Sequence, residues 1–299
     1  MRIVAALGGN ALLRRGEALD AAAQERNVVT AARALASLGE GHDLVVTHGN
    51  GPQVGMLALQ AAAGPGGDWG FDILGAESEG MIGYLIEREL APRLPHKRVV
   101  SLLTLIEVDP DDPAFNDPTK PIGPVYDAEG RAAIGRERGW TLKPEGKGWR
   151  RVVASPAPRR ILEISTIRHL VSEGFIVICA GGGGIPVQVM PDGAIRGVEA
   201  VIDKDRSSAL LAEEIGAAAL LLLSDVDGIY EGFGTPQARH LDRLAVSEIE
   251  GLGLDPGSMG PKAAAAAGFV RATGGLAVIG ALGDAEAMLA GSAGTRIVP

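Results

Sequence analysis

The chain has 299 residues, of which 46% are hydrophobic and 22% are charged, and its formal net charge is −9. This composition is that of an ordinary globular protein and excludes a largely disordered chain, while the acidic balance disfavours a general nucleic-acid binder. No apolar run reaches the roughly 18 residues of a membrane span, and a single cysteine, Cys179, excludes an internal disulfide or a multi-cysteine zinc site. We therefore expect a protein of the reducing cytoplasm, without a secretory signal.

Short apolar runs alternate with longer helical patterns along the chain. The runs that predict strands cover residues 3–7, 43–47, 99–105, 175–179, 217–223 and 276–280. The helical patterns cover residues 20–38, a stretch that begins near residue 53, and residues 74–90, 204–215 and 261–273. Strands that are apolar throughout are buried on both faces. The order therefore predicts an α/β protein, a three-layer αβα sandwich with a mainly parallel central sheet.

Residues 109–158 break this alternation. They hold eight of the 18 prolines and two of the three tryptophans, and residues 131–160 contain nine Lys or Arg against two Glu. A structureless loop of this length is uncommon in a compact domain. We therefore expect a small inserted subdomain with short strands that protrudes as a lid. An ordinary solvated basic surface is the alternative interpretation of its charge.

Four turns follow predicted strands, and three of these turns are rich in glycine. The turns lie at residues 8–10 (GGN), 48–51 (HGNG), 181–184 (GGGG) and 224–228 (SDVDG). The carboxyl ends of parallel strands meet at one edge of a sheet, and ligands bind at this edge in such folds. Backbone amides of glycine turns and helix N-termini favour an anion. The pattern therefore favours a ligand that contains phosphate.

Several familiar enzyme motifs are absent. The sequence contains no G-x-x-x-x-G-K-[ST], G-x-G-x-x-G, H-E-x-x-H, G-x-S-x-G or C-x-x-C, which disfavours a P-loop enzyme and a simple Rossmann dehydrogenase. His48 lies on a candidate site turn, but a single histidine there is more often structural. Cys179 ends an apolar strand and is interpreted as a small buried hydrophobic residue.

Two lysines lie where the start of a helix disfavours them. Lys204 follows Asp203, which is a residue type typical of helix N-caps, and Lys262 follows Pro261 at the start of the last helical pattern. A cation near a helix N-terminus faces the unfavourable end of the helix dipole. The two positions are explained if an anion binds between ammonium groups and amides, and a surface accident is the alternative for each lysine.

Seven stretches then suggest a family. They are 6–12 (ALGGNAL), 47–55 (THGNGPQVG), 115–124 (FNDPTKPIGP), 150–156 (RRVVASP), 179–187 (CAGGGGIPV), 199–205 (EAVIDKD) and 257–262 (GSMGPK). In these stretches the chain closely resembles the carbamate kinase family of the amino acid kinase superfamily. The PTKPIG stretch with its basic insertion distinguishes this family from acetylglutamate, aspartate and uridylate kinases.

The resemblance implies an amino acid kinase-like fold and a phosphotransferase with a carboxyl-type acceptor. The implied reaction is reversible phosphoryl transfer between ATP and carbamate, which gives ADP and carbamoyl phosphate and serves ATP synthesis in arginine or related nitrogen catabolism. It implies Mg²⁺ that is held mainly by the nucleotide phosphates of ATP or ADP, and no metal site made by the protein. Such transfer depends on positioning and on charge neutralisation.

The resemblance also implies roles for individual residues. Lys204 and Lys262 would neutralise the transferring phosphoryl group, Asp205 would orient them without acting as a base, and Lys120 in the lid would reach carbamate. Asn10 completes the implied catalytic set. The residues implied for substrate and phosphoryl binding are Gly8, Gly9, Gly49, Asn50, Gly51, Gly182 and Gly183. Those implied for nucleotide binding are Ser224, Asp225, Val226, Tyr230, Met259 and Gly260, although Tyr230 could equally be an ordinary loop tyrosine.

We expect a single domain over residues 1–299, with a carbamate and phosphoryl lobe over about 1–215, a nucleotide lobe over about 216–299 and the lid at 109–158. The resemblance implies a homodimer, with residues 75–90 as the candidate contact helix and ordinary core packing as the alternative for that helix. Two other functions stay open. One is a kinase of the same superfamily that acts on a different small acid, and the other is a protein that binds ATP without transfer.

Overall fold

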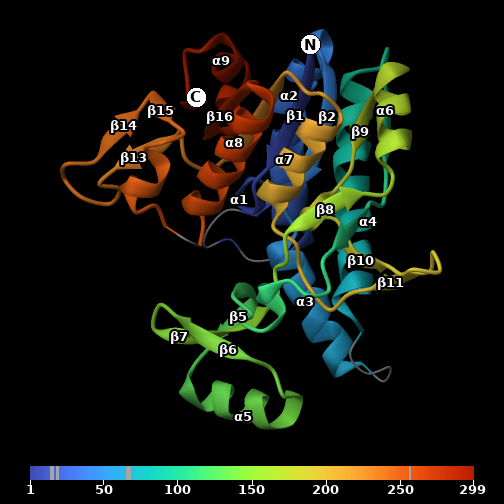
Figure 1. The fold of residues 1–299 in the computed structure, drawn as a ribbon, viewed down its shortest axis with the longest axis vertical. Coiled ribbons are helices and arrows are strands. Elements are labelled where there is room, and N and C mark those ends of the chain that lie inside the picture. Colours follow the sequence, from blue (N-terminus) through green and yellow to red (C-terminus); the bar gives the residue numbers. More distant parts are fainter. Residues whose placement is uncertain (14–16, 18–19, 65–68, 256) are drawn as a thin grey trace.

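The computed structural model describes residues 1–13, 17, 20–64, 69–255 and 257–299 (Figure 1). An eight-stranded sheet runs through it. In spatial order the strands are β15 (Arg243–Ala245), β17 (Thr295–Val298), β16 (Leu276–Ala281), β12 (Ala219–Ser224), β1 (Arg2–Leu7), β2 (Asp43–His48), β9 (Phe175–Ile178) and β3 (Arg98–Ser101). All neighbours in this sheet are parallel except β16 and β17.

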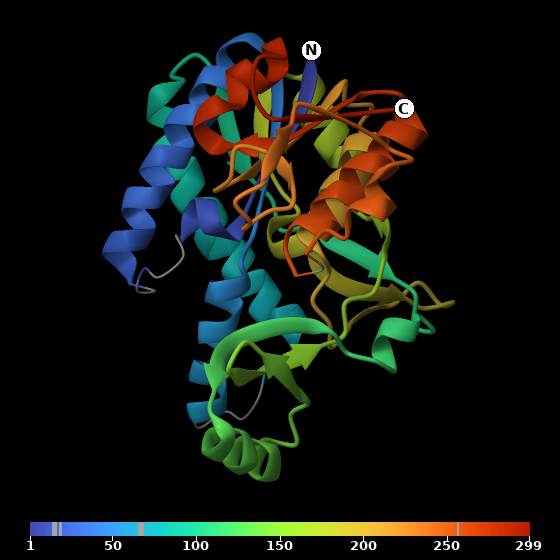
Figure 2. The same ribbon diagram turned by 90° about the vertical axis from the view of Figure 1, so that its left-hand side faces the viewer.

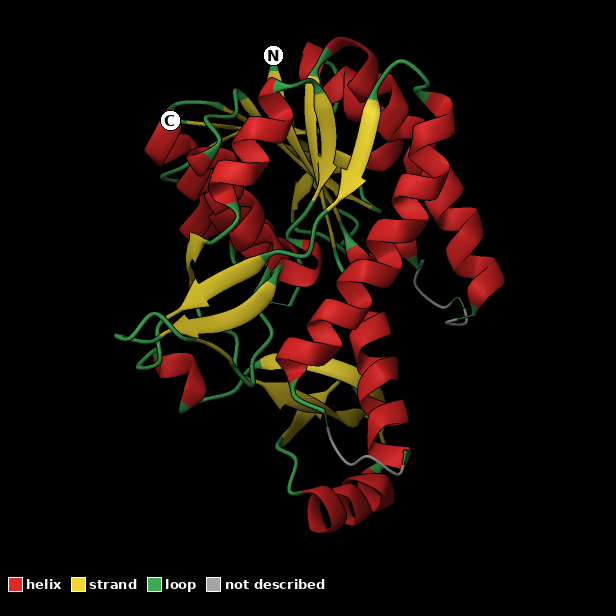
Figure 3. Cartoon of the chain, turned by 90° about the vertical axis from the view of Figure 1, so that its right-hand side faces the viewer, coloured by secondary structure: helices red, strands yellow, loops and turns green. Residues whose placement is uncertain are grey.

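Helices cover both faces of this sheet (Figure 3). One face packs against α6 (Ile164–Ser172), α7 (Lys204–Glu214) and α8 (Met259–Thr273). The other packs against α1 (Gly9–Leu12), α2 (Ala21–Gly41), α4 (Phe71–Leu90) and α9 (Ala285–Ala290). Alternate side chains of β1 enter the two cores, with Val4 in the first and Ile3 in the second. The predicted three-layer αβα sandwich with a mainly parallel sheet is therefore confirmed.

A second sheet has four strands, β11 (Ile195–Gly197), β10 (Ile185–Val189), β4 (Leu105–Val108) and β8 (Pro158–Ile161). It corrects one expectation, the single strand over 99–105. Leu102 N–H still donates to the carbonyl of Ile178 in the first sheet, whereas the Thr104 carbonyl accepts from Ile185 in the second. The chain therefore crosses between sheets here, and the predicted strand is two strands, β3 and β4.

The inserted segment forms a separate unit at one end of the molecule (Figure 2). Its antiparallel sheet contains β5 (Lys120–Tyr126), β7 (Gly148–Val153) and β6 (Leu142–Glu145), and α5 (Ala128–Arg138) covers it. Within the segment 109–158 expected to form the lid, residues 120–153 form this unit, and from here on we use the name lid for these residues. Helix α3 (Gly51–Ala63) packs against β5, and Val54 shares a small core with Ile122 and Val153. The short strands match the expectation, while α5 was not foreseen.

The remaining elements are short. A hairpin of β13 (Ile229–Glu231) and β14 (Arg239–Leu241) lies beside the large sheet near the C-terminal strands. Five 3₁₀ turns complete the described elements: η1 (Ala91–Arg93), η2 (Pro113–Phe115), η3 (Gly181–Gly183), η4 (Ile249–Leu252) and η5 (Leu282–Asp284). Within the described ranges, no helix combines the length and the apolar character that a membrane crossing requires.

Candidate active site

A cavity of about 630 Å³ opens at the carboxyl ends of β12, β1 and β2, between the large sheet, the lid and the β13–β14 hairpin. Most of the predicted site residues line it: Gly8, Gly9, Gly49, Asn50, Gly51, Lys120, Gly182, Lys204, Asp205, Ser224, Asp225, Val226, Tyr230, Met259 and Lys262. The four strand-end turns thus meet at one edge of the sheet. They do so because β12, β1, β2 and β9 are consecutive parallel strands.

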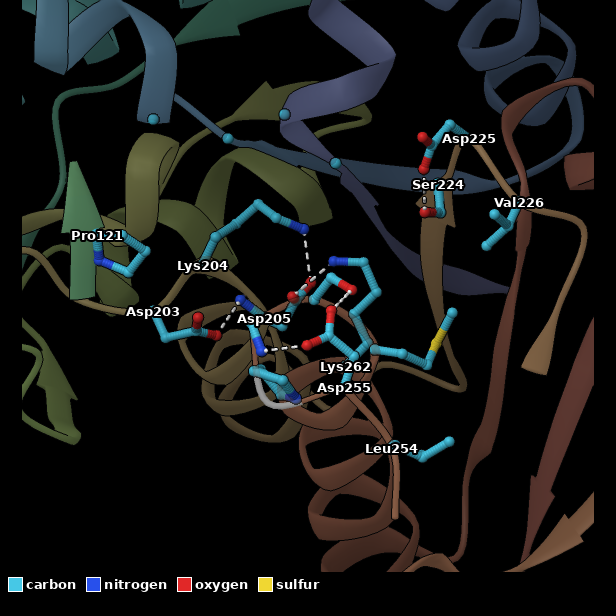
Figure 4. A pocket seen from close by; sticks show the side chains of 18 of the residues that line it. Pro121, Asp203, Lys204, Asp205, Ser224, Asp225, Val226, Leu254, Asp255 and Lys262 are labelled. Carbon is cyan, nitrogen blue, oxygen red and sulfur yellow. Dashed lines mark hydrogen bonds and ion pairs between the residues drawn. The ribbon is translucent and has the colours of Figure 1, made fainter. Parts of the chain in front are cut away.

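Two ammonium groups meet at one carboxylate in this cavity (Figure 4). Lys204 and Asp205 begin α7, and Lys262 lies in the first turn of α8. Lys204 Nζ donates to Asp205 Oδ1 at 2.6 Å, and Lys262 Nζ donates to Asp205 Oδ2 at 2.9 Å. Helices α7 and α8 pack side by side, which brings the two helix starts together. The disfavoured positions of both lysines are therefore offset by a shared counter-ion.

The charges of this cluster are strongly coupled. Burial by itself would raise the pKa of the Asp205 carboxyl, but the ammonium groups of Lys204 and Lys262 hold that pKa well below its usual range. Burial lowers the pKa of Lys204, and the Asp205 carboxylate counteracts this effect. Asp205 is therefore ionised at neutral pH, and a carboxyl with so low a pKa is a poor general base.

The lid contributes a third lysine. Lys120, the first residue of β5, donates from Nζ to Asp203 Oδ2 at 2.6 Å. The other oxygen of Asp203 accepts from the amides of Asp205 and Arg206 at 3.0 and 3.2 Å and so caps α7. Burial would raise the pKa of Asp203, but Lys120 lowers it. One carboxylate therefore connects the lid to the helix that carries Lys204 and Asp205.

Buried hydroxyl groups fix α7 against the strand-end turns. Ser207 Oγ donates to the Gly183 carbonyl at 2.7 Å, and Ser208 Oγ donates to the Lys204 carbonyl at 2.7 Å. Ser208 Oγ also lies 2.6 Å from Thr47 Oγ1 on β2. These contacts hold the start of α7 in register with β2 and the glycine turn.

Two glycines bring the first two turns into close contact. A Cβ on Gly8 would lie 2.9 Å from the Leu223 carbonyl oxygen, and one on Gly49 would lie 2.9 Å from the Gly9 nitrogen. The amides of Gly8 and Gly49 donate to the carbonyls of Leu223 and Leu7, and so extend the sheet. Gly9 and Gly51 are the first residues of α1 and α3, where amides have no partner within the helix. Among the glycines of these two turns, Gly9 and Gly51 therefore present the amides that a ligand can use.

Comparison with known proteins identifies the family. Residues 1–280 match the amino acid kinase family. The chain is 50% identical over 301 residues to a carbamate kinase of Rhizobium meliloti (strain 1021), with 99% of this chain and 93% of the relative covered. It is 44% identical over 313 residues to a carbamate kinase of Pyrococcus furiosus, with 100% and 99% covered.

A solved structure agrees. The carbamate kinase from Giardia lamblia bound to AMP-PNP superposes with a TM-score of 0.89 at 39% identity, over 99% of this chain and 98% of that one. The chain belongs to the carbamate kinases of the amino acid kinase family.

In this member of the amino acid kinase family, two of the predicted site residues do not line the cavity, and the side chain of a third is not described by the structure. Gly183 does not line the cavity; it lies behind the lining, where its carbonyl accepts from Ser207. Gly260 does not line it either, and its amide donates to the Asp255 carbonyl at 2.8 Å. The side chain of Asn10, predicted as catalytic, is outside the described part of the structure.

The opposite end of the cavity is more apolar and contains residues that the sequence reasoning missed. Leu252, Leu254 and Phe233 line it together with the predicted Tyr230 and Met259. The rings of Tyr230 and Phe233 meet edge to face at 6.0 Å, and Phe233 is 71% exposed. Aromatic and aliphatic side chains of this kind suit the face of a planar ring system.

Asp203 was predicted only as a helix cap, and its contact with Lys120 was missed. No periodic pattern links the two residues, because they are 83 positions apart. The available signals were the basic lid and the two aspartates, Asp203 and Asp205, at the helix start. Their opposite charges could have suggested the pair.

A protein-held metal site is not apparent in the described ranges, where no three His, Cys, Asp or Glu side chains form a cluster suited to an ion. Asp205 is engaged by two lysines and Asp203 by a third. Mg²⁺ prefers one or two carboxylates together with water and substrate phosphates. The donor set is compatible with an ion that is bound mainly by substrate phosphates.

Proposed function

We propose that this cavity catalyses reversible phosphoryl transfer between ATP and carbamate, which yields ADP and carbamoyl phosphate. The chain is a phosphotransferase by family, and a nucleotide is its substrate. The observation that carries the assignment is the carboxylate of Asp205, which gathers the ammonium groups of Lys204 and Lys262 at the rim formed by the strand-end turns. This arrangement suits an anion in transfer between two small molecules.

Lys204 and Lys262 act as electrostatic catalysts. Their ammonium groups neutralise charge on the transferring phosphoryl group, and the amides of Gly9 and Gly51 donate to its oxygens from the N-termini of α1 and α3. Asp205 orients both lysines and accepts no substrate proton, because it is already paired and ionised. No general base is needed, since carbamate enters as an anion and can attack the phosphoryl group directly.

Lys120 binds the phosphoryl acceptor, carbamate. In the structure its ammonium group pairs with Asp203 at 2.6 Å, and both residues line the cavity. An anionic substrate competes with Asp203 for this ammonium group, so Lys120 exchanges one oxygen partner for another when substrate binds. The lid thereby closes over the anion and excludes water, which would otherwise hydrolyse carbamoyl phosphate.

The nucleotide occupies the apolar end. Tyr230 and Phe233 of the β13–β14 hairpin and Leu254 before α8 would surround the adenine. Ser224 and Asp225, at the end of β12, would bind the ribose. The lobe over about 1–215 then holds the phosphoryl acceptor, and the lobe over about 216–299 holds the nucleotide. Mg²⁺ held mainly by the nucleotide phosphates would neutralise part of their charge.

The direct test supplies the purified chain with ADP, Mg²⁺ and carbamoyl phosphate and follows ATP by luciferase luminescence. We expect ATP, and its absence would refute the proposal in favour of a protein that binds nucleotide without transfer. Lys120→Ala should reduce turnover at least about 100-fold and leave ADP affinity within about threefold. The matched control is Lys143→Ala, a lid lysine whose ammonium group pairs with the exposed Asp117; it should leave turnover unchanged. Full turnover of carbamoyl phosphate by Lys120→Ala would remove the role assigned to Lys120.

We also propose that two copies associate through α4. Tyr84 on this helix is 60% exposed, and Leu103, just after the edge strand β3, is 53% exposed. Large apolar side chains at a sheet edge and on the neighbouring helix are typical of an interface. Sedimentation should give a dimer that Tyr84→Asp dissociates, and a wild-type monomer at micromolar concentration would refute the interface.

A further inference from the structure

The glycine turn that follows β9 has an unusual backbone. Ala180 has φ +49°, and it is the only non-glycine residue with a positive φ in the described part of the chain. Gly182, Gly183 and Gly184 follow with φ of +67°, +100° and +83°. Such a conformation is costly for alanine and persists only if the surroundings hold it. Gly182 lines the active-site cavity, so whatever holds this turn also determines the shape of the site.

Two buried side chains hold the start of the turn from behind. Glu79 on α4 accepts from the Gly181 amide through Oε1 at 2.8 Å, and Thr104 Oγ1 accepts from the Ala180 amide at 2.9 Å. The Thr104 amide lies 3.3 Å from Glu79 Oε2, which links the two anchors. Glu79 is 3% exposed and Thr104 is fully buried. Neither side chain lines the cavity.

The same helix holds the second turn. Ser78, next to Glu79, accepts from the Asn50 side-chain amide at 2.8 Å. A Cβ on Gly182 would lie 2.1 Å from Asn50 Nδ2, so the two turns touch where both line the cavity. A shift of the glycine turn by a few tenths of an ångström would therefore displace Asn50. Helix α4 thus acts as a support behind the phosphoryl end of the site.

We infer that Glu79 is a positioning residue for phosphoryl transfer, which acts through the glycine turn. The inference rests on the proposed function, because it concerns the end of the cavity where the phosphoryl group binds. It concerns Glu79 alone, a residue that touches neither substrate in this arrangement.

The surroundings of Glu79 disfavour a charge. Burial raises the pKa of its carboxyl to about 8. The hydrogen bonds from Gly181 and Thr104 act in the opposite direction and lower this pKa, whereas repulsion from Glu163 raises it. The other titratable groups nearby offer no cation: burial lowers the pKa of His48 to about 4, and burial raises the pKa of the Cys179 thiol. Glu79, His48 and Cys179 also line a neighbouring cavity, which Glu87 and Tyr84 face. In the described part of the chain, Lys204 is the one cation that affects the pKa of His48, and its ammonium group is already paired with Asp205.

Ionisation of Glu79 would therefore place an uncompensated negative charge behind the turn that cradles an anion. The charge would weaken binding of the phosphoryl group in the transition state, since the intervening region is buried and poorly screened. A glutamine at this position keeps a carbonyl oxygen for the Gly181 amide and cannot ionise, while its NH2 group gives up only the longer 3.3 Å contact with the Thr104 amide. A leucine keeps the volume and removes the acceptor.

The experiment measures steady-state ATP formation from ADP and carbamoyl phosphate by wild type, Glu79→Gln and Glu79→Leu. Glu79→Gln should keep kcat within about threefold near neutral pH, whereas Glu79→Leu should lose about 10- to 100-fold in kcat with KM for ADP nearly unchanged. Between about pH 7 and 9, wild-type kcat should fall and Glu79→Gln should stay level. Glu77→Gln, an exposed neighbour on α4, is the matched control and should follow the wild-type profile.

The outcomes separate the two proposals. If wild type turns over and folded Glu79→Leu matches its kcat, Glu79 has no positioning role while the proposed function stands. If Glu79→Gln keeps its activity but retains the wild-type alkaline decline, the requirement for an uncharged group is wrong. If wild type does not turn over at all, the proposed function fails and this inference fails with it. Circular dichroism and ADP binding establish that Glu79→Leu is folded.

Discussion

Asp205→Asn removes one negative charge and almost no volume, so it tests how much the site depends on the charge of this carboxylate. In the wild type the Asp205 carboxylate is shared by Lys204 at 2.6 Å and Lys262 at 2.9 Å, and the Asp205 side chain is 6% exposed. The substitution leaves two ammonium groups close together without a counter-ion. Breaking a buried pair by removal of one partner costs about 3–5 kcal/mol.

The structure also sets an upper limit to this cost. Burial already lowers the pKa of Lys204, and Asp205 is the main group that raises it again. Without the carboxylate, Lys204 can lose its proton, and the folded protein then avoids the cost of a buried charge that has no counter-ion. For a lysine with an ordinary pKa near 10.4, this release costs about 5 kcal/mol at pH 7. We therefore expect the free energy of unfolding to fall by about 3–5 kcal/mol, and kcat by about 100- to 1000-fold.

The sign of the pH dependence follows from the same argument. In Asp205→Asn, Lys204 binds its proton less tightly in the folded state than in the unfolded state, so stability should rise with pH through the alkaline range. Urea unfolding followed by circular dichroism measures this, with the exposed Asp111→Asn as the control, which should change stability by less than about 0.5 kcal/mol. Asp205→Asn within about 1 kcal/mol of wild type and with kcat within about tenfold would refute the coupled cluster.

Three further predictions concern the turns and the helix start. Gly182→Ala should lower kcat at least about tenfold, because its Cβ would lie 2.1 Å from Asn50 Nδ2; Gly193→Ala, with a similar positive φ but open space, should not. Glu79 binds its proton more tightly when folded and His48 binds its proton less tightly, so their contributions to the pH dependence offset each other up to about pH 6.5. Between about pH 6.5 and 8 the wild-type free energy of unfolding should therefore fall, by at most about 1.4 kcal/mol per pH unit, and Glu79→Gln should remove this contribution in urea titrations. Asp203→Ala should cost about 1 kcal/mol through loss of the α7 cap and should lower KM for carbamoyl phosphate, because the competitor for Lys120 is removed, and an unchanged KM would argue against this competition.

The parallel layers and the shared edge of the turns could be predicted from the sequence, because both follow from local patterns. Runs such as 219–223 are apolar throughout and buried throughout, and each turn follows its strand directly. The position of Lys204 and Lys262 at two helix starts was likewise readable. That the two ammonium groups share one carboxylate depends on the packing of α7 against α8, which no local pattern specifies.

The residues missed by sequence reasoning depend on contacts between distant segments. Strand β4 belongs to a second sheet, because the Thr104 carbonyl accepts from Ile185 about 80 residues later. Glu79 adjoins the buried stripe of α4 that contains Leu74, Ser78 and Ile82. A carboxyl group beside an apolar stripe is a readable signal of a functional or structural contact, but its partner, the amide of Gly181, could be found only from the fold.

The central claim is that ammonium groups gathered by Asp205 stabilise a phosphoryl group during transfer. The most direct measurement is single-turnover phosphoryl transfer by Lys204→Ala, with ATP affinity determined separately and the exposed Lys147→Ala as control. We predict a transfer rate constant about 100- to 1000-fold below wild type and an ATP Kd within about fivefold of it. A variant that loses nucleotide affinity while it retains the wild-type rate constant would contradict the account.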